Sequence, residues 1–230
     1  MLEIRHKICV SIIESSERSV LLAAREAEEQ GADLIEIRLD CLEQLTRESV
    51  AQLFRSLSVI PLPKVATIMP KTLFGRFEGG DSERVELLSE AAGHADYVDV
   101  GLEMEPSLLM ECMRKVEKRA GVILSRHSDR PLTAGEISSI VREGYGGVVH
   151  KVAMLARGLE DNLVALEACR SLESFRRIIF CYGRAGVISR VLSPFFGSEW
   201  AYASLRKGKE AAPGQLDIES LRMVQGVLGG

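Results

Sequence analysis

Apolar segments of strand length alternate with amphipathic segments of helix length along the whole chain. Eight runs have the length and apolar content of strands, and they cover residues 7–13, 34–40, 64–69, 97–103, 121–127, 147–153, 177–183 and 199–205. Between these runs apolar residues recur at helical spacing, as in the predicted face of Leu159, Leu163 and Leu166. Strands that alternate with helices predict parallel pairing of the strands.

Eight strand–helix units in 230 residues predict a single (β/α)8 TIM barrel, an α/β fold, over residues 1–230. No linker rich in Gly, Pro or Ser divides the chain. The alternative is an open doubly wound sheet, which usually carries a glycine-rich turn after its first strand. Residues 11–19, "SIIESSERS", contain no glycine, so the pattern favours the barrel.

Composition narrows the class of protein without fixing its function. Hydrophobic residues make up 46% and charged residues 27%, the net charge is −4, and no basic cluster indicates a nucleic-acid partner. No apolar run is long enough to span a membrane, and the first residues do not form a signal peptide, so we expect a cytoplasmic protein. The five cysteines are unpaired in spacing, which predicts reduced, buried thiols and neither disulfides nor a zinc site.

Charged residues lie inside several of the predicted strands. In "LIEIRLD" the side chains of Glu36, Arg38 and Asp40 alternate with Ile35, Ile37 and Leu39, so the charged set faces away from the helices. Buried charges require partners or a ligand. A purely structural Glu–Arg pair is the alternative interpretation.

Lys151 is the most informative of these residues, because it lies in "GGVVHKVAML" among valines. Desolvation disfavours the charged form of an amine, which is how an enzyme obtains a nucleophilic lysine near neutral pH. The alternative is a lysine that extends to solvent at the strand end. His127, at the carboxyl end of an earlier strand, is a candidate proton carrier, whereas we interpret His150 as structural.

Taken in order, "GADLIEIRLD", "EGGDSER", "ADYVDV", "SRHS", "HKVAML", "YGRAGVISR", "FGSEWAYAS" and "APGQLD" resemble the type I 3-dehydroquinate dehydratase family nearly from end to end. The resemblance implies a (β/α)8 barrel that converts 3-dehydroquinate, a small-molecule substrate, to 3-dehydroshikimate in the shikimate pathway. It implies a lysine Schiff base without a metal ion or organic cofactor. A homodimer is expected from the family alone.

The resemblance also assigns roles to individual residues. Lys151 would form the imine, His127 would move protons as general base and acid, and Glu78 of "EGG" would orient His127. Arg190 would bind the substrate carboxylate. The remaining substrate-binding candidates, which would contact hydroxyl groups, are Ser11, Glu36, Arg38 and Gln215.

Two positions depart from the family pattern. An arginine usually follows the third strand, near Thr67, where this chain has Met69, and a serine often stands where it has Ala211. Arg76 is a candidate substitute for the missing arginine, in the glycine-containing segment 69–84 that we interpret as a lid. The alternative is that Arg76 is a solvated loop residue.

Two other functions remain open from the sequence. A class I aldolase would share the lysine and the fold, but it does not account for His127 together with "EGG" and "PGQ". A catalytically inactive barrel that serves as a binding module would explain Met69 and Ala211, but the joint presence of the polar set argues against it.

Overall fold

The computed structural model describes residues 6–142 and 145–229. Its strands and helices alternate as the sequence predicts, and the strands form one sheet in the order β7-β6-β5-β4-β3-β2-β1-β8. The pairs β2–β3, β3–β4 and β6–β7 are parallel. The fold is an α/β (β/α)8 TIM barrel, which confirms the predicted class.

Contacts divide the chain into two compact units. Residues 11–124 form one, which we call the central unit, and residues 1–10 together with 125–230 form the other, the terminal unit. The first strand and the fifth strand are each shared between the two units. That residues 1–230 behave as one domain remains a prediction.

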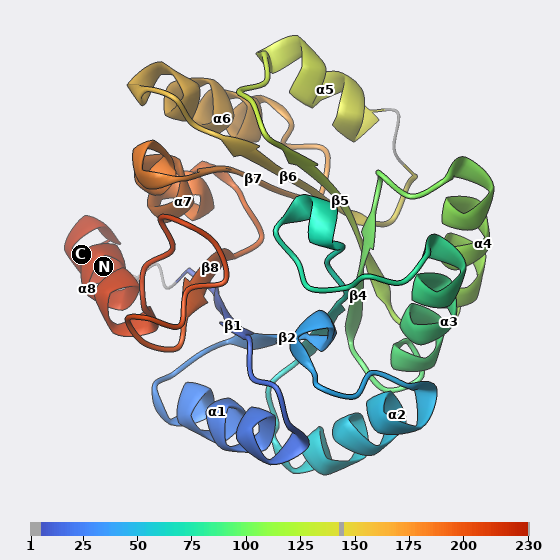
Figure 1. The fold of residues 1–230 in the computed structure, drawn as a ribbon. Helices are drawn as coiled ribbons and strands as arrows, with labels where there is room; N and C mark the ends of the chain where they lie inside the picture. The colour runs from blue at the N-terminus through green and yellow to red at the C-terminus, as the bar shows by residue number, and fades with distance from the viewer. Residues whose placement is uncertain (1–5, 143–144, 230) are drawn as a thin grey trace. The chain divides into compact units, whose positions relative to one another are not determined.

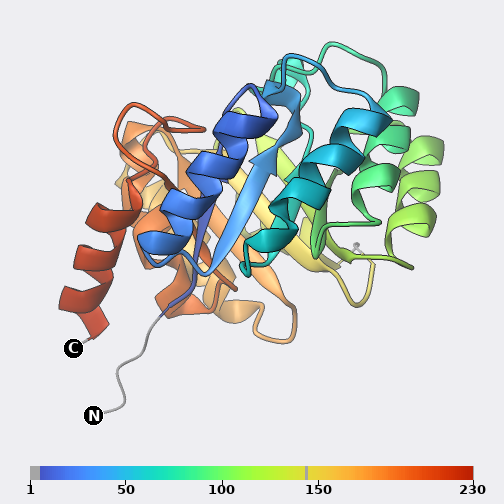
Figure 2. The same ribbon diagram turned by 90° about the horizontal axis from the view of Figure 1, so that it is seen from below.

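The central unit contains most of the first half of the alternation. Its strands are β1 (Ile8–Ile12, shared), β2 (Leu34–Arg38), β3 (Lys64–Thr67) and β4 (Tyr97–Gly101). Its helices are α1 (Glu17–Glu29), α2 (Arg47–Ser56), α3 (Asp81–Ala91) and α4 (Pro106–Val116). The helices lie along one side of these strands (Figure 1), and α1 and α2 run beside β2 (Figure 2).

The terminal unit contains the second half. Its strands are β5 (Gly121–Ser128, shared), β6 (Val149–Leu155), β7 (Arg177–Tyr182) and β8 (Ala201–Ser204), the last of which is shorter than the predicted run. Its helices are α5 (Ala134–Arg142), α6 (Leu159–Ser171), α7 (Val187–Leu192) and α8 (Ile218–Gly229). In Figure 1, α5 and α6 lie on the outer side of β6 and β7.

Alternation along β6 and β7 separates two faces. Val152, Met154, Ile179 and Cys181 pack into a fully buried core with residues of α5 and α6, so this face is turned to the helices. Lys151 pairs in register with Ile178, and its side chain therefore lies on the opposite face. Lys151 thus lies on the face of these two strands that is turned away from α5 and α6.

The predicted apolar face of α6 is wrong for two of its three residues. Leu159 and Leu163 are 55% and 58% exposed, whereas Asn162 is completely buried. The Asn162 amide donates to the carbonyls of Gly158 and Ala185, and its oxygen accepts from the Ser189 N–H at 3.0 Å and hydroxyl at 2.8 Å. These bonds turn α6 so that Asn162 faces inward, because a buried amide is stable only when its hydrogen bonds are satisfied.

The described residues also bear on the cysteines and on membrane-spanning helices. All five cysteines are buried and free, which confirms the prediction of reduced, buried thiols. Among the helices that the structure describes, none is both long and apolar enough to cross a bilayer.

Replacing Asn162 with Ala should lower the free energy of unfolding by roughly 1–3 kcal/mol, because it leaves the Ser189 N–H and the Ala185 carbonyl buried without this partner. Urea denaturation followed by the fluorescence of Trp200, the only tryptophan and 2% exposed, measures the change. The exposed Gln30, which bonds Glu26 on the surface of α1, provides the control, since Gln30→Ala should change stability by less than about 0.5 kcal/mol. Equal effects in the two variants would contradict the role of Asn162.

Candidate functional site

Glu36 is the centre of a buried polar cluster on the first three strands. Its side chain is on β2, is 4% exposed, and accepts hydrogen bonds from the Ser11 hydroxyl at 2.7 Å and the Thr67 hydroxyl at 3.0 Å. Ser11 comes from β1 and Thr67 from the end of β3. The structure therefore brings together two of the predicted site residues, Ser11 and Glu36, and adds Thr67 to them.

Arg38, two residues further along β2, forms a bidentate ion pair with Asp40. Its Nε and Nη2 donate to the two Asp40 oxygens at 2.8 and 2.7 Å, and the Asp40 side chain is completely buried. Burial alone lowers the pKa of the Arg38 guanidinium, but the hydrogen bonds and charge of Asp40 outweigh burial and raise this pKa above its ordinary value. Arg38 is thus a fixed cation whose position is set by Asp40.

The same carboxylate also holds the segment that follows β3. The backbone N–H of Met69 donates to Asp40 Oδ1 at 3.2 Å, and the N–H of Arg76 donates to Oδ2 at 3.0 Å. Each Asp40 oxygen therefore accepts two hydrogen bonds, one from Arg38 and one from the backbone. Such saturation makes a buried carboxylate tolerable and ties β2 to the predicted lid.

The predicted lid is a folded turn in this structure. Pro70 and Phe77 form a parallel bridge, Phe77 is 8% exposed, and a short 3₁₀ helix spans Lys71–Leu73. Gly75 is required here, because a Cβ atom at this position would lie 1.8 Å from the carbonyl oxygen of Met69. The backbone of Arg76 is anchored to Asp40, while its side chain is exposed.

Glu78 lies on the surface of this turn. Its carboxylate accepts from the Lys71 ammonium at 2.6 Å, and both side chains are at least 70% exposed. The hydrogen bond and charge of Lys71 lower the pKa of Glu78 below its ordinary value. Glu78 is therefore an ionised carboxylate engaged with Lys71, and its assignment to His127 remains a prediction.

In the terminal unit, the Lys151 ammonium is buried against an aromatic ring. Lys151 is 4% exposed, and its Nζ lies 4.5 Å from the ring centroid of Tyr202 on β8. The Tyr202 ring also contacts the rings of Trp200 and Phe180. A cation over an aromatic face is attracted by the ring quadrupole, which offsets part of the cost of burial.

Arg190 has a similar environment. It lies on α7, is 4% exposed, and its guanidinium carbon is 4.6 Å from the ring centroid of Phe180 on β7. The residue before it, Ser189, is fixed by Asn162 and accepts from the N–H of Cys181 at 2.9 Å. Arg190 therefore lies on a short helix that is fixed, through Ser189, to Asn162 of α6 and to the backbone of β7.

His127 and Gln215 complete the predicted set in this unit. His127 is half-buried near the end of β5. Gln215 is 6% exposed and accepts the N–H of Ala211 at 2.7 Å, so this contact does not depend on the side chain at position 211. Gly214 has a φ of 81°, and the loop is joined to the end of β7 through the bond from the Gly183 N–H to the Pro213 carbonyl.

His150 is buried beside an aromatic ring. His150 is 3% exposed and lies edge-on to Phe175 with ring centroids 5.8 Å apart, and burial lowers its pKa. These contacts favour a structural role. Across the described ranges, no three His, Cys, Asp or Glu side chains gather in an arrangement that could hold a metal ion.

The fold and these residues define a (β/α)8 enzyme with a buried lysine, and comparisons with known proteins identify its family. A model of the family described as type I 3-dehydroquinase matches residues 8–230. A 3-dehydroquinate dehydratase of Methanothermobacter thermautotrophicus is 33% identical over 96% of this chain and 97% of the relative. The corresponding protein of Methanopyrus kandleri is 34% identical over 90% of this chain and 92% of its own.

Solved structures agree. The type I 3-dehydroquinate dehydratase of Clostridium difficile superposes with a TM-score of 0.89 at 27% identity, covering 98% of this chain and 93% of the other. The 3-dehydroquinate dehydratase of Geobacillus kaustophilus gives a TM-score of 0.89 at 26% identity, covering 98% and 91%. The chain belongs to the type I 3-dehydroquinase family. Its activity is that of a 3-dehydroquinate dehydratase, a hydro-lyase of the shikimate pathway.

Three residues that organise the site are not identified from the sequence alone, namely Thr67, Asp40 and Tyr202. Asp40 shares the predicted face of Glu36 and Arg38, but its bonds to Met69 and Arg76 join segments far apart in the chain. The available signal was a carboxylate two residues after a buried arginine on the same predicted face. Tyr202 lies in the last predicted strand, and no local pattern connects it with Lys151.

Replacing Asp40 with Ala should release the turn over residues 70–77 and make the bonds after Lys71 and Arg76 accessible to trypsin. The substitution removes both hydrogen bonds that anchor the backbone of the turn. It also removes the partner of the buried Arg38, and breaking such a buried pair costs about 3–5 kcal/mol. The initial rate of cleavage at these two bonds, followed by mass spectrometry under conditions where the protein stays folded, measures the effect.

Glu78→Gln is the matched control, because it removes a carboxylate tether from the same turn at an exposed position. Exposed ion pairs contribute at most about 1 kcal/mol, so cleavage should stay close to that of the unaltered protein. Equally fast cleavage in both variants would show that Asp40 does not anchor the turn.

Proposed function

We propose that the dehydration proceeds through a Schiff base on Lys151. The observation that carries this proposal is the burial of Lys151 on the strand face turned away from the helices, with its ammonium over the Tyr202 ring. A lysine is rarely fully buried unless it is paired or its amine has a chemical function. The amine would attack the substrate ketone and release water to give an imine.

The imine supports the remaining chemistry as an electron sink. When it is protonated, the carbon beside it loses a proton more easily, and the electron pair moves toward the nitrogen. The resulting enamine returns the pair and expels the neighbouring hydroxyl group as water. Hydrolysis then releases 3-dehydroshikimate and restores the amine, so that atoms and charge balance over the cycle.

We assign the proton transfers to His127. Its imidazole would take the proton from the carbon next to the imine and deliver a proton to the departing hydroxyl. A positioned imidazole typically contributes 10²–10⁴-fold to such a step. Support comes from its place at the carboxyl end of β5, where catalytic residues of barrel enzymes gather.

The remaining assignments concern substrate binding. Arg190 would bind the carboxylate, because its planar guanidinium matches the two oxygens, and Gln215 would contact a hydroxyl group. Ser11, Glu36 and Arg38 would contact other hydroxyls. Glu36 accepts hydrogen bonds from Ser11 and Thr67, and Arg38 donates hydrogen bonds to Asp40. In the proposed complex each would form further hydrogen bonds with the substrate.

Glu78 would have to exchange its partner Lys71 to act as proposed. The Lys71–Glu78 pair is exposed and therefore exchanges at little cost. The Arg76 backbone is anchored while its side chain is exposed, so the side chain can reorient without breaking the bond to Asp40. We propose that Glu78 orients His127 and that Arg76 supplies the cation absent at Met69.

A solved relative supports covalent chemistry in the family. The Clostridium difficile enzyme has been described with covalent modified comenic acid. A nucleophile able to form a covalent product is what the proposal requires of Lys151. The cytoplasmic location remains a prediction from the composition of the sequence, and the homodimer and the absence of a cofactor remain predictions from the resemblance.

Borohydride reduction in the presence of 3-dehydroquinate should attach one substrate-derived mass to Lys151. Reduction converts an imine to a stable secondary amine, so peptide mass spectrometry should find the modification in the segment 150–155. Lys151→Met should abolish it, whereas Lys118→Met, at an exposed lysine of the chain, should not. Modification at a different lysine would refute the Schiff-base assignment.

His127→Ala should separate formation of the imine from turnover. We expect borohydride still to trap the Lys151 adduct, while kcat for the enone product, followed by its ultraviolet absorbance, falls by at least about 10²-fold. His150→Phe is the control, because His150 packs against Phe175 and has no assigned part in the reaction. Turnover near the normal rate in His127→Ala would mean that another group moves the proton.

A further inference from the structure

Several hydrogen bonds hold the segment that directly follows His127. The next residue, Ser128, is the last of β5, where the ladder of the sheet ends. Its carbonyl accepts a hydrogen bond from the hydroxyl of Tyr182 at 3.0 Å. Tyr182 is on β7 and is 6% exposed.

This hydrogen bond reaches across the strand that carries Lys151. In the sheet, β6 lies between β5 and β7, and Tyr182 pairs in register with Leu155 of β6, as Ile178 pairs with Lys151. Residues two apart along a strand share a face, so Tyr182 lies on the same face as Lys151. The bond from Tyr182 to Ser128 therefore ties the end of the histidine strand to the scaffold that holds the lysine.

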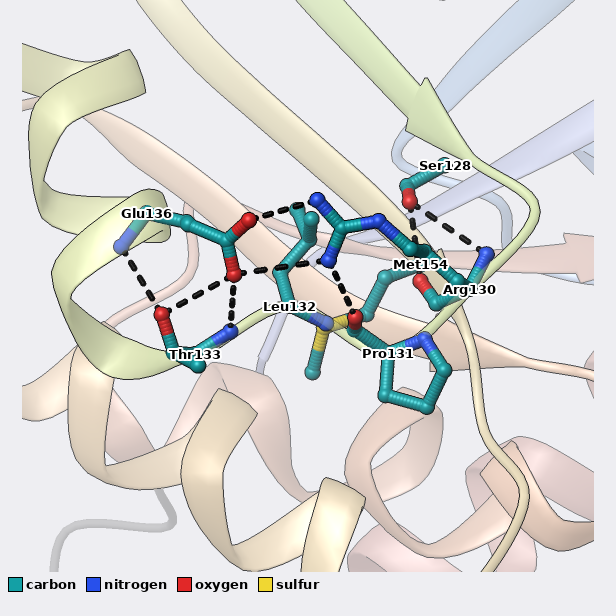
Figure 3. Close-up of polar contacts among 7 residues, drawn as sticks. All are labelled: Ser128, Arg130, Pro131, Leu132, Thr133, Glu136 and Met154. Carbon is teal, nitrogen blue, oxygen red and sulfur yellow. Dashed lines mark hydrogen bonds and ion pairs between the residues drawn. The ribbon is translucent and has the colours of Figure 1, made fainter.

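The loop beyond Ser128 is fixed from the outer side as well. Leu132 donates its N–H to the sulfur of Met154, which is on the helix-facing side of β6, at 3.2 Å. Thr133 and Glu136 cap the first turn of α5 reciprocally, and Arg130 forms a two-pronged contact with the Glu136 carboxylate (Figure 3). The Arg130 bond, with help from Thr133, lowers the pKa of Glu136 to about 2, so this contact stays charged at neutral pH.

These outer contacts differ from Tyr182 in kind. The Arg130–Glu136 pair is largely exposed, and an N–H bond to a thioether is weak. Of these tethers, the Tyr182 bond is the one that comes from the face of Lys151 and reaches the backbone of the residue bonded directly to His127. Burial raises the pKa of this phenol, and the charge of Asp129 raises it further, so Tyr182 remains a neutral donor.

We infer that Tyr182 is a positioning residue for His127, which it holds through the carbonyl of Ser128. This inference rests on the proposed function of His127. Proton transfer depends on placement of the imidazole to within a few tenths of an ångström, because misplacement by about 1 Å costs on the order of 100-fold in rate. The formation of the imine on Lys151 needs no such placement.

The test uses Tyr182→Phe, which removes only the hydroxyl group. We expect kcat to fall by roughly three- to tenfold, the range given by the loss of one hydrogen bond, with KM changed less than twofold. Borohydride should trap the Lys151 adduct at the normal rate. Tyr145→Phe, at an exposed tyrosine of the same unit, is the matched control and should leave both constants unchanged.

A readout on the imidazole itself separates positioning from general stability. The chain has four histidines, so the His127 signals in a heteronuclear NMR spectrum can be assigned with one His127→Gln variant. In Tyr182→Phe we expect the His127 signals to shift and those of His6, His94 and His150 to keep their positions. Unchanged kcat with unmoved His127 signals would overturn the inference, and so would a rise in KM at constant kcat, which would make Tyr182 a substrate contact.

The variants His127→Ala and Tyr182→Phe test the role of His127 and the role of Tyr182 separately. Normal turnover by His127→Ala would remove His127 from the mechanism whatever Tyr182 does. Shifted His127 signals in Tyr182→Phe support the link from Tyr182 to His127 independently of turnover. A shift confined to the other histidines would count against that link even if His127 is catalytic.

Discussion

The cost of removing charge from water governs the arrangement of this protein's functional residues. Glu36, Arg38, Lys151 and Arg190 are each less than 7% exposed, although charged side chains are rarely buried without partners. Each therefore has a defined environment that compensates for lost hydration. Hydrogen bonds contribute to this compensation in the central unit, and aromatic rings contribute to it in the terminal unit.

In the central unit hydrogen bonds to the buried carboxylates contribute to this compensation. Asp40 receives both a bidentate arginine and two backbone N–H groups, while Glu36 receives the hydroxyls of Ser11 and Thr67. Such networks rigidify the elements that they join, because every donor lost would leave a buried acceptor without a partner. The anchored turn after β3 is a direct consequence of this requirement.

In the terminal unit two buried cations lie against aromatic faces. Lys151 lies over Tyr202, Arg190 lies over Phe180, and the two rings contact each other. A ring face attracts a cation through the quadrupole of the ring, which offsets part of the cost of burial. These two cations are the groups to which we assign the imine and the substrate carboxylate.

The sequence by itself determined the alternation of strands and helices, the family, and which face of the strands holds Glu36, Arg38 and Lys151. The alternation and the faces follow from the two-residue period of a strand and the spacing of apolar positions, which are local, whereas the family follows from the resemblance of the motifs. Only the tertiary structure decided that Asp40 anchors the turn of residues 70–77, that Glu78 pairs with Lys71, and that Asn162 is buried while Leu159 and Leu163 are exposed. Each of these outcomes depends on partners that meet only in the folded chain. In α6 the hydrogen bonds of the buried Asn162 outweigh the preference of Leu159 and Leu163 for the core.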